Sequence, residues 1–363
     1  MTGQSDVRTV RAADGWGAGT GFTGDAGAEA SDAQKRPTAG LPFRTHLLAR
    51  IEQAGIRRVI LSTSFKAEVF EEHFGDGAEL GLHIEYLTEK DPLGTGGGIR
   101  NVLPKIQADN VLVFNGDVLG GTDLNALLAT HHDRKADVTM HLVRVGDARS
   151  FGCVPTDDDG RVTAFLEKTE DPPTDQINAG CYVFRREVIE QIPDGRPVSV
   201  EREIFPALLT EGARVYGHVD ASYWRDMGTP EDFVRGSADL VRGIAPSPAL
   251  EGPRGESLFH ASAGVAPGAL LIGGTVVGRV VEVGAGARLD GAVRFDGAKV
   301  EAGAVVERSI VGFGARIGPR ALIRDAVIGD GADVGARCEL VGGARVWPGV
   351  HLPDGGVRFS TDV

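Results

Sequence analysis

The sequence predicts an α/β domain with a Rossmann-like, mixed and mostly parallel sheet, followed by a left-handed parallel β-helix. Up to about residue 245, apolar runs of strand length alternate with amphipathic helical stretches, a pattern typical of βαβ units. The segment GIAPSPALEGPRGES (243–257) is rich in Pro, Gly and Ser and indicates a linker. After it, single aliphatic residues recur every six positions. We therefore expect a first domain over 37–243, a linker over 244–258 and a β-helix over 259–363.

The elements of the first domain follow in chain order. The expected strands are RRVILST (57–63), HIEYL (83–87), NVLVFNGD (110–117), ADVTMHLVRV (136–145) and INAGCYVF (177–184). The expected helices are AEVFEEHF (67–74), DLNALLATHH (123–132) and RPVSVEREIFPALL (196–209). Strands alternating with helices in this way predict a sheet with helical crossovers.

The expected β-helix follows from one repeated spacing. In a β-helix each hexad forms one face of a triangular coil, stacks its aliphatic residue inward and needs small residues at the corners. A disordered Gly/Ala-rich tail would not keep its aliphatic residues in register. The residues expected to point inward are Val265, Leu271, Val277, Val283, Leu289 and Phe295, and, after an offset, Val311, Ile317, Ile323, Val334, Leu340, Val346 and Leu352.

The composition excludes several classes of protein. With 42% hydrophobic and 25% charged residues, the chain has the composition of a globular protein. Its formal charge of −13 argues against nucleic acid and anionic membranes as partners. No apolar run resembles a signal peptide or a membrane span, so we expect a cytoplasmic protein. The three cysteines are far apart and predict neither a disulfide framework nor a zinc site.

Four short motifs of the first domain could carry chemistry. EKDPLGTGGGIRNVL (89–103) places a glycine-rich loop before a helix, where backbone can approach a base or a phosphate. VLVFNGDVL (111–119) ends a buried strand near Asp117, at the sheet edge where α/β ligands bind. VTAFLEKT (162–169) presents Glu167 beside Lys168, and YWRDMGTPEDF (223–233) places Asp226 before a helix start. Each motif by itself is also compatible with an ordinary turn.

Taken in order, the motifs resemble those of the sugar-1-phosphate nucleotidyltransferases. The set is Leu-Gly-Thr-Gly-Gly, Asn-Gly-Asp, Phe-Gly, Phe-Leu-Glu-Lys, Ile-Asn-Ala-Gly and Trp-x-Asp-x-Gly-Thr-Pro, with the β-helix behind it. The PLGTGGGIRN loop (92–101) and the tail are most similar to the mannose-1-phosphate guanylyltransferases within that family. The resemblance extends from about Pro37 to the C-terminus.

The resemblance implies a reaction and a role for each matching residue. A sugar 1-phosphate, mannose 1-phosphate, would attack the α-phosphorus of a nucleoside triphosphate, GTP, and release pyrophosphate. Asp117 and Asp226 match the carboxylates that hold Mg²⁺, and Lys168 matches a lysine that contacts the sugar phosphate. Glu167, Asn178 and the backbone of Gly152 match groups that bind the sugar. The base and ribose loop corresponds to Leu93, Gly94, Thr95 and Gly97. The open end of a β-helix further predicts a homo-oligomer.

The N-terminal stretch WGAGTGFTGDAGAEASDAQKRPTAGLPF (16–43) departs from the family pattern. The family begins with an apolar strand and a glycine-rich phosphate loop that contains an arginine, whereas here Gly21 stands at the arginine position. Read one nucleotide late, the codons of residues 25–33 can encode Thr-Leu-Ala-Arg-Lys-Pro-Pro-Met-Pro, which is similar to the family's segment. We therefore expect residues 1–36 not to form the phosphate loop, through a shifted frame or through natural divergence.

Several functions are compatible with this sequence. The first is a guanylyltransferase that makes GDP-mannose, with activity impaired by the aberrant N-terminus. A non-catalytic nucleotide-sugar-binding regulatory subunit is the second. A glucose-1-phosphate thymidylyl- or adenylyltransferase would use the same motifs. An acyltransferase built on the β-helix usually needs a histidine base, and the tail offers only His260 and His351.

Overall fold

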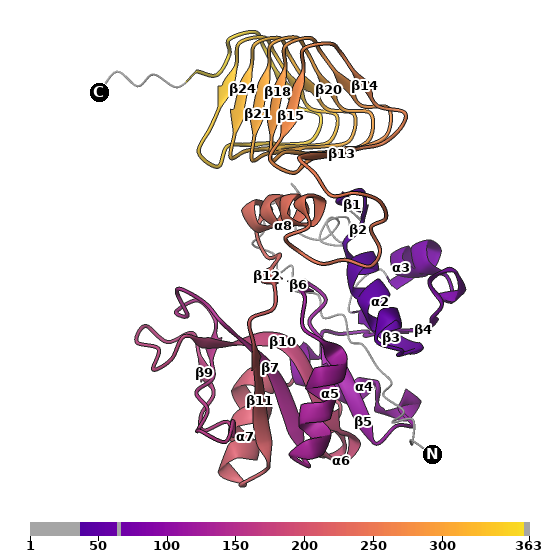
Figure 1. The fold of residues 1–363 in the computed structure, drawn as a ribbon, viewed down its shortest axis with the longest axis vertical. Coiled ribbons are helices and arrows are strands. Elements are labelled where there is room, and N and C mark those ends of the chain that lie inside the picture. Colours follow the sequence, from indigo (N-terminus) through magenta and orange to yellow (C-terminus); the bar gives the residue numbers. More distant parts are fainter. Residues whose placement is uncertain (1–36, 64–66, 359–363) are drawn as a thin grey trace. The chain divides into compact units, whose positions relative to one another are not determined.

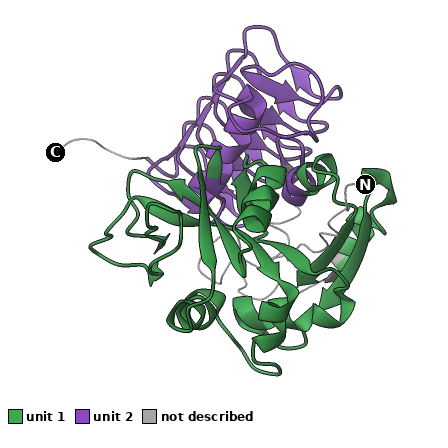
Figure 2. Ribbon diagram, turned by 60° about the horizontal axis from the view of Figure 1, so that its bottom comes forward, with its two compact units in different colours: residues 1–15, 48–224 green, residues 16–47, 225–363 purple. Residues whose placement is uncertain are grey.

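The computed structural model describes residues 37–63 and 67–358. They form two compact units, one of residues 48–63 and 67–224, the other of residues 37–47 and 225–358 (Figure 2). The division falls inside helix α2 (Phe43–Gln53) and strand β12 (Trp224–Asp226). The aberrant stretch 1–36 and the shifted-frame hypothesis for it lie outside the described residues.

The first unit contains a mixed sheet, as the sequence predicts, but most strand pairs of its six-stranded sheet are antiparallel rather than parallel. Its central strand β10 (Gln176–Arg185) pairs antiparallel with β5 (Asn110–Phe114), β7 (Val138–Arg144) and β8 (Gly152–Cys153). β11 (Val215–Asp220) runs parallel to β7, and β9 (Leu166–Glu167) pairs with β8. Thus β5, β7 and β11 share one direction and β10 opposes them. The core of this sheet is apolar, from Val111 on β5 to Val215 on β11.

Shorter elements complete the first unit. β3 (Arg58–Thr63) and β4 (His83–Thr88) form a parallel pair, and β6 (Val118–Gly120) follows β5. The helices are α3 (Ala67–Phe74), α4 (Gly94–Asn101), α5 (Leu124–Asp133), α6 (Arg186–Gln191) and α7 (Phe205–Thr210), with 3₁₀ turns η1 (Ala78–Leu80) and η2 (Leu103–Lys105) and a π-helical turn η3 (Val200–Ile204).

Local capping explains where two of these helices begin. The Asp123 carboxylate accepts from the amides of Asn125 and Ala126 and caps α5. The helix expected over 196–209 is wrong at its start, because helical structure begins only at Val200. Residue Ser199 caps that turn, and Val198 forms backbone hydrogen bonds to α4 instead.

The second unit begins with a hairpin, β1 (Pro37–Thr38) and β2 (Leu41–Pro42), and contains helix α8 (Pro230–Arg242). Thr229 caps α8 by accepting from the Asp232 amide, and Gly243 ends it with a φ of 76°. The Ala39 amide donates to Ser237 Oγ on α8 at 2.9 Å. Among the helices that the structure describes, none is long and apolar enough to cross a membrane.

The rest of the second unit is a parallel β-helix, as the sequence predicts (Figure 1). Its first sheet comprises β13 (Ser257–Phe259), β16 (Thr275–Val277), β19 (Val293–Arg294), β22 (Ile310–Val311), β25 (Val327–Ile328) and β28 (Arg345–Val346). The second comprises β14 (Gly264–Val265), β17 (Glu282–Val283), β20 (Lys299–Val300), β23 (Arg316–Ile317), β26 (Asp333–Val334) and β29 (His351–Leu352). The third comprises β15 (Leu270–Ile272), β18 (Arg288–Asp290), β21 (Val305–Glu307), β24 (Leu322–Arg324) and β27 (Glu339–Leu340).

Two of the positions expected to point inward differ from the expectation: Val265, on the first coil, is exposed, and Phe295 lies outside the expected column. Arg294, not Phe295, pairs with Val277 on one side and Val311 on the other, so Arg294 occupies the column expected for Phe295. The reason is that the middle coils, from β16 to β27, are spaced by 17 residues, as in the hydrogen bond from Ala292 to Thr275, so one face of each of these coils is a residue shorter than a hexad. Phe295 is still buried, but it stacks on Phe313.

Candidate functional site

Asp117 follows the buried strand β5 in the turn Asn115-Gly116-Asp117. The Asn115 amide donates to the Gly180 carbonyl at 2.7 Å, which ties this turn to β10. The Asp117 side chain is half-buried. The buried strand β5 therefore fixes where the turn begins. The backbone hydrogen bond from Asn115 to Gly180 fixes the position of the turn relative to β10.

Asn178 lies at the start of a bulge in β10, where the register with β7 shifts between Asn178 and Tyr182. Its Nδ2 donates to the Tyr182 hydroxyl at 2.6 Å, and its Oδ1 accepts from the Gly180 amide at 3.0 Å. Burial raises the pKa of Tyr182 well above its ordinary value, so the hydroxyl stays protonated. The orientation of the Asn178 amide is thus fixed from inside the protein.

Gly180 makes this bulge possible. Its φ is 72°, and a Cβ there would lie 2.9 Å from Asn115 Nδ2 and 3.1 Å from Asn115 Cβ. An alanine would have to adopt a left-handed conformation and displace the side chain beside it. The glycine of the Ile-Asn-Ala-Gly motif is therefore required for packing between the bulge and the Asp117 turn.

Gly152, Glu167 and Lys168 lie on the neighbouring strands. Gly152 pairs with Glu167, and a Cβ on Gly152 would stand 3.1 Å from Glu167 Oε2. The Lys168 amide donates to the Phe151 carbonyl at 3.3 Å. Because Cys153 pairs with Ile177, the next residue along β10, Asn178, lies beside Gly152. Of the four residues that the resemblance assigns to the sugar phosphate, Gly152, Glu167 and Asn178 thus lie together on β8, β9 and β10, and Lys168 directly follows β9.

The loop of Leu93, Gly94, Thr95 and Gly97 opens α4 and packs on residues 196–201. The amides of Gly96 and Gly97 donate to the Val198 carbonyl at 2.7 and 3.3 Å. A Cβ on Gly94 would lie 2.7 Å from the same carbonyl oxygen. The Thr95 hydroxyl donates to Glu201 Oε2 at 2.6 Å. The glycines of this loop are therefore needed at least for close packing, whatever they bind.

Asp226 ends β12 and belongs to the second unit. Its Oδ1 accepts from the Gly228 amide at 2.9 Å, which orients the carboxylate just before the α8 cap. No cluster of three or more His, Cys, Asp or Glu suited to a metal occurs among residues 37–63 and 67–358. A carboxylate oxygen such as that of Asp226 is the kind of donor that a hard divalent ion prefers.

A polar network at the end of β11 was not expected from the sequence. Asp220 accepts from the hydroxyls of Thr122 and Ser222, each at 2.6 Å, and its Oδ1 lies 3.0 Å from His141 Nε2. Burial alone would raise the pKa of Asp220, but these hydrogen bonds lower the pKa below its usual range. The Arg50 guanidinium donates to the Thr122 carbonyl at 2.7 Å.

Other contacts of the site also escaped sequence reasoning. Tyr182 contacts Asn178, Asn115 contacts Gly180 and Glu201 contacts Thr95. Of the three contacting residues, only Asn115 could have been recognised in the sequence, because it is a polar residue at the end of a buried strand. The cysteines are free and buried, as expected of small core residues.

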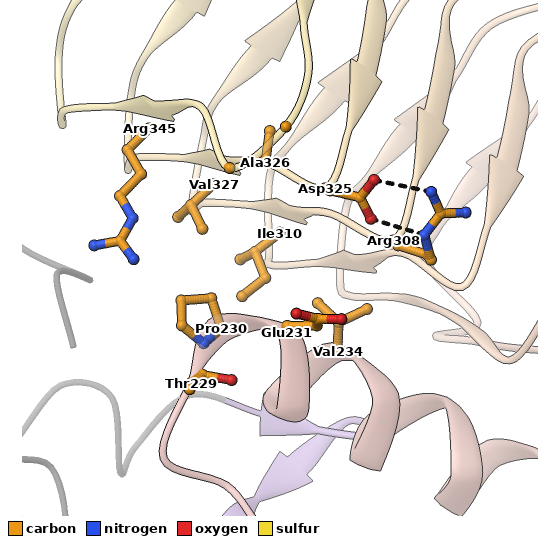
Figure 3. A pocket seen from close by; sticks show the side chains of 12 residues that line it. Thr229, Pro230, Glu231, Val234, Arg308, Ile310, Asp325, Ala326, Val327 and Arg345 are labelled. Atoms are coloured by element: carbon orange, nitrogen blue, oxygen red, sulfur yellow. Dashed lines mark hydrogen bonds and ion pairs between the residues drawn. The ribbon is translucent and has the colours of Figure 1, made fainter.

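A pocket of about 410 Å³ lies elsewhere, within the second unit between the start of α8 and the β-helix (Figure 3). Thr229, Pro230 and Val234 line it from the helix. From the β-helix, Arg308 donates twice to the Asp325 carboxylate, at 2.7 and 2.9 Å, and Arg345 lines another side. None of the residues that the sequence assigns to the site lines this pocket.

Comparisons with known proteins agree with both parts of the chain. The nucleotidyl transferase family matches residues 35–243, and the GMPPB C-terminal domain matches residues 254–353. A mannose-1-phosphate guanylyltransferase of Mycobacterium tuberculosis is 74% identical over 328 residues, 90% of this chain and 91% of the relative. A D-glycero-alpha-D-manno-heptose 1-phosphate guanylyltransferase of Aneurinibacillus thermoaerophilus is 32% identical over 56% of this chain and 87% of its own length. The structure of HddC from Yersinia pseudotuberculosis complexed with GMP-PN is 27% identical with a TM-score of 0.55, and covers 64% of this chain and 100% of that one.

Proposed function

The chain belongs to the nucleotidyl transferase family, and from that premise we propose that it forms GDP-mannose and pyrophosphate from GTP and mannose 1-phosphate. The observation that carries the proposal is the grouping of Gly152, Glu167 and Asn178 on three adjacent strands, with Lys168 directly after one of them, in a chain 74% identical to a mannose-1-phosphate guanylyltransferase. A glucose-1-phosphate thymidylyl- or adenylyltransferase is less favoured on the same ground.

In the proposed reaction, a phosphate oxygen of mannose 1-phosphate forms a bond to the α-phosphorus of GTP while the bond to pyrophosphate breaks. Glu167 and Asn178 bind sugar hydroxyls, the Gly152 backbone contacts the sugar, and Lys168 contacts the attacking phosphate. Leu93, Gly94, Thr95 and Gly97 hold the base and ribose. No side chain needs to form a covalent intermediate, because positioning and charge neutralisation lower the barrier of such transfers.

Enzymes of this family generally use a divalent metal, and we propose Mg²⁺ as the ion. Asp117 and Asp226 would hold it, since their hard oxygen donors match its preference. When bound, the ion neutralises negative charge on the phosphates. The Asn115 and Gly228 amides, which fix the two carboxylate segments, support these assignments.

The N-terminal stretch, residues 16–36, should determine how fast this chain converts GTP and mannose 1-phosphate. A lost transition-state donor of the phosphate-loop type costs on the order of 10² to 10³ in rate. We expect the chain as written to be at least that much slower than a version with residues 16–36 restored to the shifted frame. The measurement is pyrophosphate release from GTP and mannose 1-phosphate, with ATP, dTTP and glucose 1-phosphate as competitors. Equal rates in both versions would contradict the frame hypothesis, and no turnover in either would contradict the proposed function.

The second candidate, a regulatory subunit, is distinguished by the same pair of proteins. It predicts GDP-mannose binding in both and turnover in neither. An acyltransferase is less favoured, because His260 and His351 are exposed and pair locally with Ser262 and Asp333.

We also propose that the chain forms a homo-oligomer. Within the described part of the chain, the first-coil strands β13, β14 and β15 pair on one side only, with β16, β17 and β18. Phe259, Val265 and Leu270 on these strands are exposed. Unpaired strand edges with exposed apolar residues favour association. Light scattering that gives the 38.1 kDa mass of one chain would contradict this.

A further inference from the structure

Trp224 makes two directed contacts in the first unit. Its indole Nε1 donates to the Ala179 carbonyl at 3.0 Å. Its ring meets the Phe151 ring edge to face, with centroids 5.3 Å apart and an interplanar angle of 82°. Trp224 and Phe151 both pack against a small apolar cluster that includes Val143, Ile177 and Ala179 and is separate from the main core. The indole therefore has one fixed position, set by a hydrogen bond and by packing.

These two contacts lead to both sides of the proposed sugar site. Ala179 directly follows Asn178 in the β10 bulge, and its carbonyl is the group that the indole holds. Phe151 directly precedes Gly152, and its carbonyl accepts from the Lys168 amide. A shift of the indole would thus move the backbone next to Asn178 and the backbone next to Gly152 and Lys168.

The residues before Trp224 are held by hydrogen bonds of their own. The Gly121 amide, just after β6, donates to the Tyr223 carbonyl at 2.7 Å. The Asp220 network with Thr122 and Ser222 anchors the end of β11 close by in the chain. Two residues after Trp224, the same strand β12 ends in Asp226. The indole is thus a side-chain link between the sugar-site strands and the strand that carries a proposed metal ligand.

We propose that Trp224 is a positioning residue that couples sugar binding to metal binding. The inference rests on the proposed function, because the roles of Asn178, Lys168 and Asp226 are part of it. Occupation of the sugar site fixes the bulge, the bulge fixes the indole, and the indole restricts the strand that leads to Asp226. By reciprocity, the metal ion then strengthens binding of the sugar half of the ligand.

Binding measurements on the full chain as it exists test this without requiring turnover. Calorimetry compares GDP-mannose with GDP, each with and without Mg²⁺. The variant Trp224→Phe keeps an aromatic ring against Phe151 but removes the N–H donor. Trp347→Phe is the matched control, because Trp347 is an exposed tryptophan of the β-helix.

We expect Trp224→Phe to reduce the preference for GDP-mannose over GDP by about two- to tenfold, the range of one hydrogen bond. The factor by which Mg²⁺ strengthens GDP-mannose binding should fall with it, while affinity for GDP without Mg²⁺ stays unchanged. Trp224→Leu should reduce both quantities further, and Trp347→Phe neither.

Two results would overturn the inference, and they are distinguishable. If the unaltered chain prefers GDP-mannose but Trp224→Phe and Trp224→Leu keep both its preference and its Mg²⁺ factor, Trp224 only supports the fold. A lowered thermal midpoint alone would lead to the same conclusion. If the unaltered chain shows no preference for GDP-mannose over GDP, the proposed function fails and the inference fails with it.

Discussion

The β-helix and the first unit build their interiors in different ways. In the β-helix one spacing repeats, so Val283, Val300 and Ile317 occupy equivalent places on successive coils. In the first unit each contact near the site occurs once, as when Gly180 accommodates Asn115 or the Asn178 amide meets Tyr182. The β-helix should tolerate a substitution in one coil, because the neighbouring coils keep the strand register. A unique contact has no substitute, so we expect substitutions in the two regions to differ in consequence.

The largest difference should follow from removing a proposed metal ligand. In the frame-restored chain, Asp117→Asn should reduce turnover by about 10³-fold or more, because the ion contributes several kcal/mol of charge stabilisation. The thermal midpoint should stay nearly unchanged, since the two side chains have the same shape. Pyrophosphate release measures the first quantity and calorimetry the second. Asp333→Asn, on the β-helix, is the control, and its turnover should equal that of the parent. Full activity in Asp117→Asn would refute the assignment.

A pair of glycine substitutions compares the two regions directly. Gly180 and Gly343 both have positive φ, 72° and 86°, but a methyl group added at Gly180 would meet Asn115, whereas one added at Gly343 would have no atom of the described residues within 4 Å beyond its chain neighbours. Each alanine variant incurs about 1 to 2 kcal/mol of left-handed strain. Gly180→Ala should lose about 2 to 4 kcal/mol of unfolding free energy in total, because the Asn115 side chain must also move.

Chemical denaturation of both variants measures these losses. Gly180→Ala should also weaken the preference for GDP-mannose over GDP, since Asn178 depends on the same bulge. Equal losses of stability in Gly180→Ala and Gly343→Ala, with ligand preference unchanged, would show that the contact with Asn115 has no role.

Arg294 is a charged residue in a column of the β-helix that otherwise holds aliphatic side chains. Its guanidinium is buried in the inward column, and none of its three nitrogens has a hydrogen-bond partner among residues 37–63 and 67–358. Burial lowers the pKa of Arg294 to about 9, which still leaves it charged at neutral pH. Replacing an uncompensated buried charge with an aliphatic side chain should stabilise the unit, so Arg294→Leu should gain about 1 to 4 kcal/mol.

The control for Arg294 is an arginine of the same β-helix that does have partners. Arg316 donates to Glu301 and Asp333, both at 2.7 Å, and is partly exposed. Arg316→Leu should change stability by less than about 1 kcal/mol and should not raise it. Thermal unfolding of both variants measures the difference. A lower midpoint in Arg294→Leu would mean that the guanidinium is compensated inside the coil.

The same contrast explains what could be predicted from the sequence. Periodicity predicted the β-helix and most of its inward residues, because one rule governs many positions. It failed at Phe295, where a face one residue shorter moves Arg294 into the column. In the first unit, motif order predicted residues that the structure brings together on β8, β9 and β10. It could not predict Tyr182 or Trp224 as their supports, because those contacts depend on a bulge that has no periodic signal.

The last expected effect concerns pH, and it should be similar in the two units. His46 in the second unit and His131 in the first are buried, and burial lowers the pKa of each to about 4. A histidine whose pKa is lowered in the folded state contributes full stability above its unfolded pKa of about 6.5. That contribution is lost as the pH falls from about 6.5 towards 4, by about 1.4 kcal/mol per pH unit for each histidine.

Urea unfolding at a series of pH values measures this loss. The free energy of unfolding should fall with decreasing pH, and His46→Gln should reduce that slope. If His46→Gln leaves the slope unchanged, His46 is solvated in the folded protein, and the network that joins it to Ser247 and Thr38 does not exclude water.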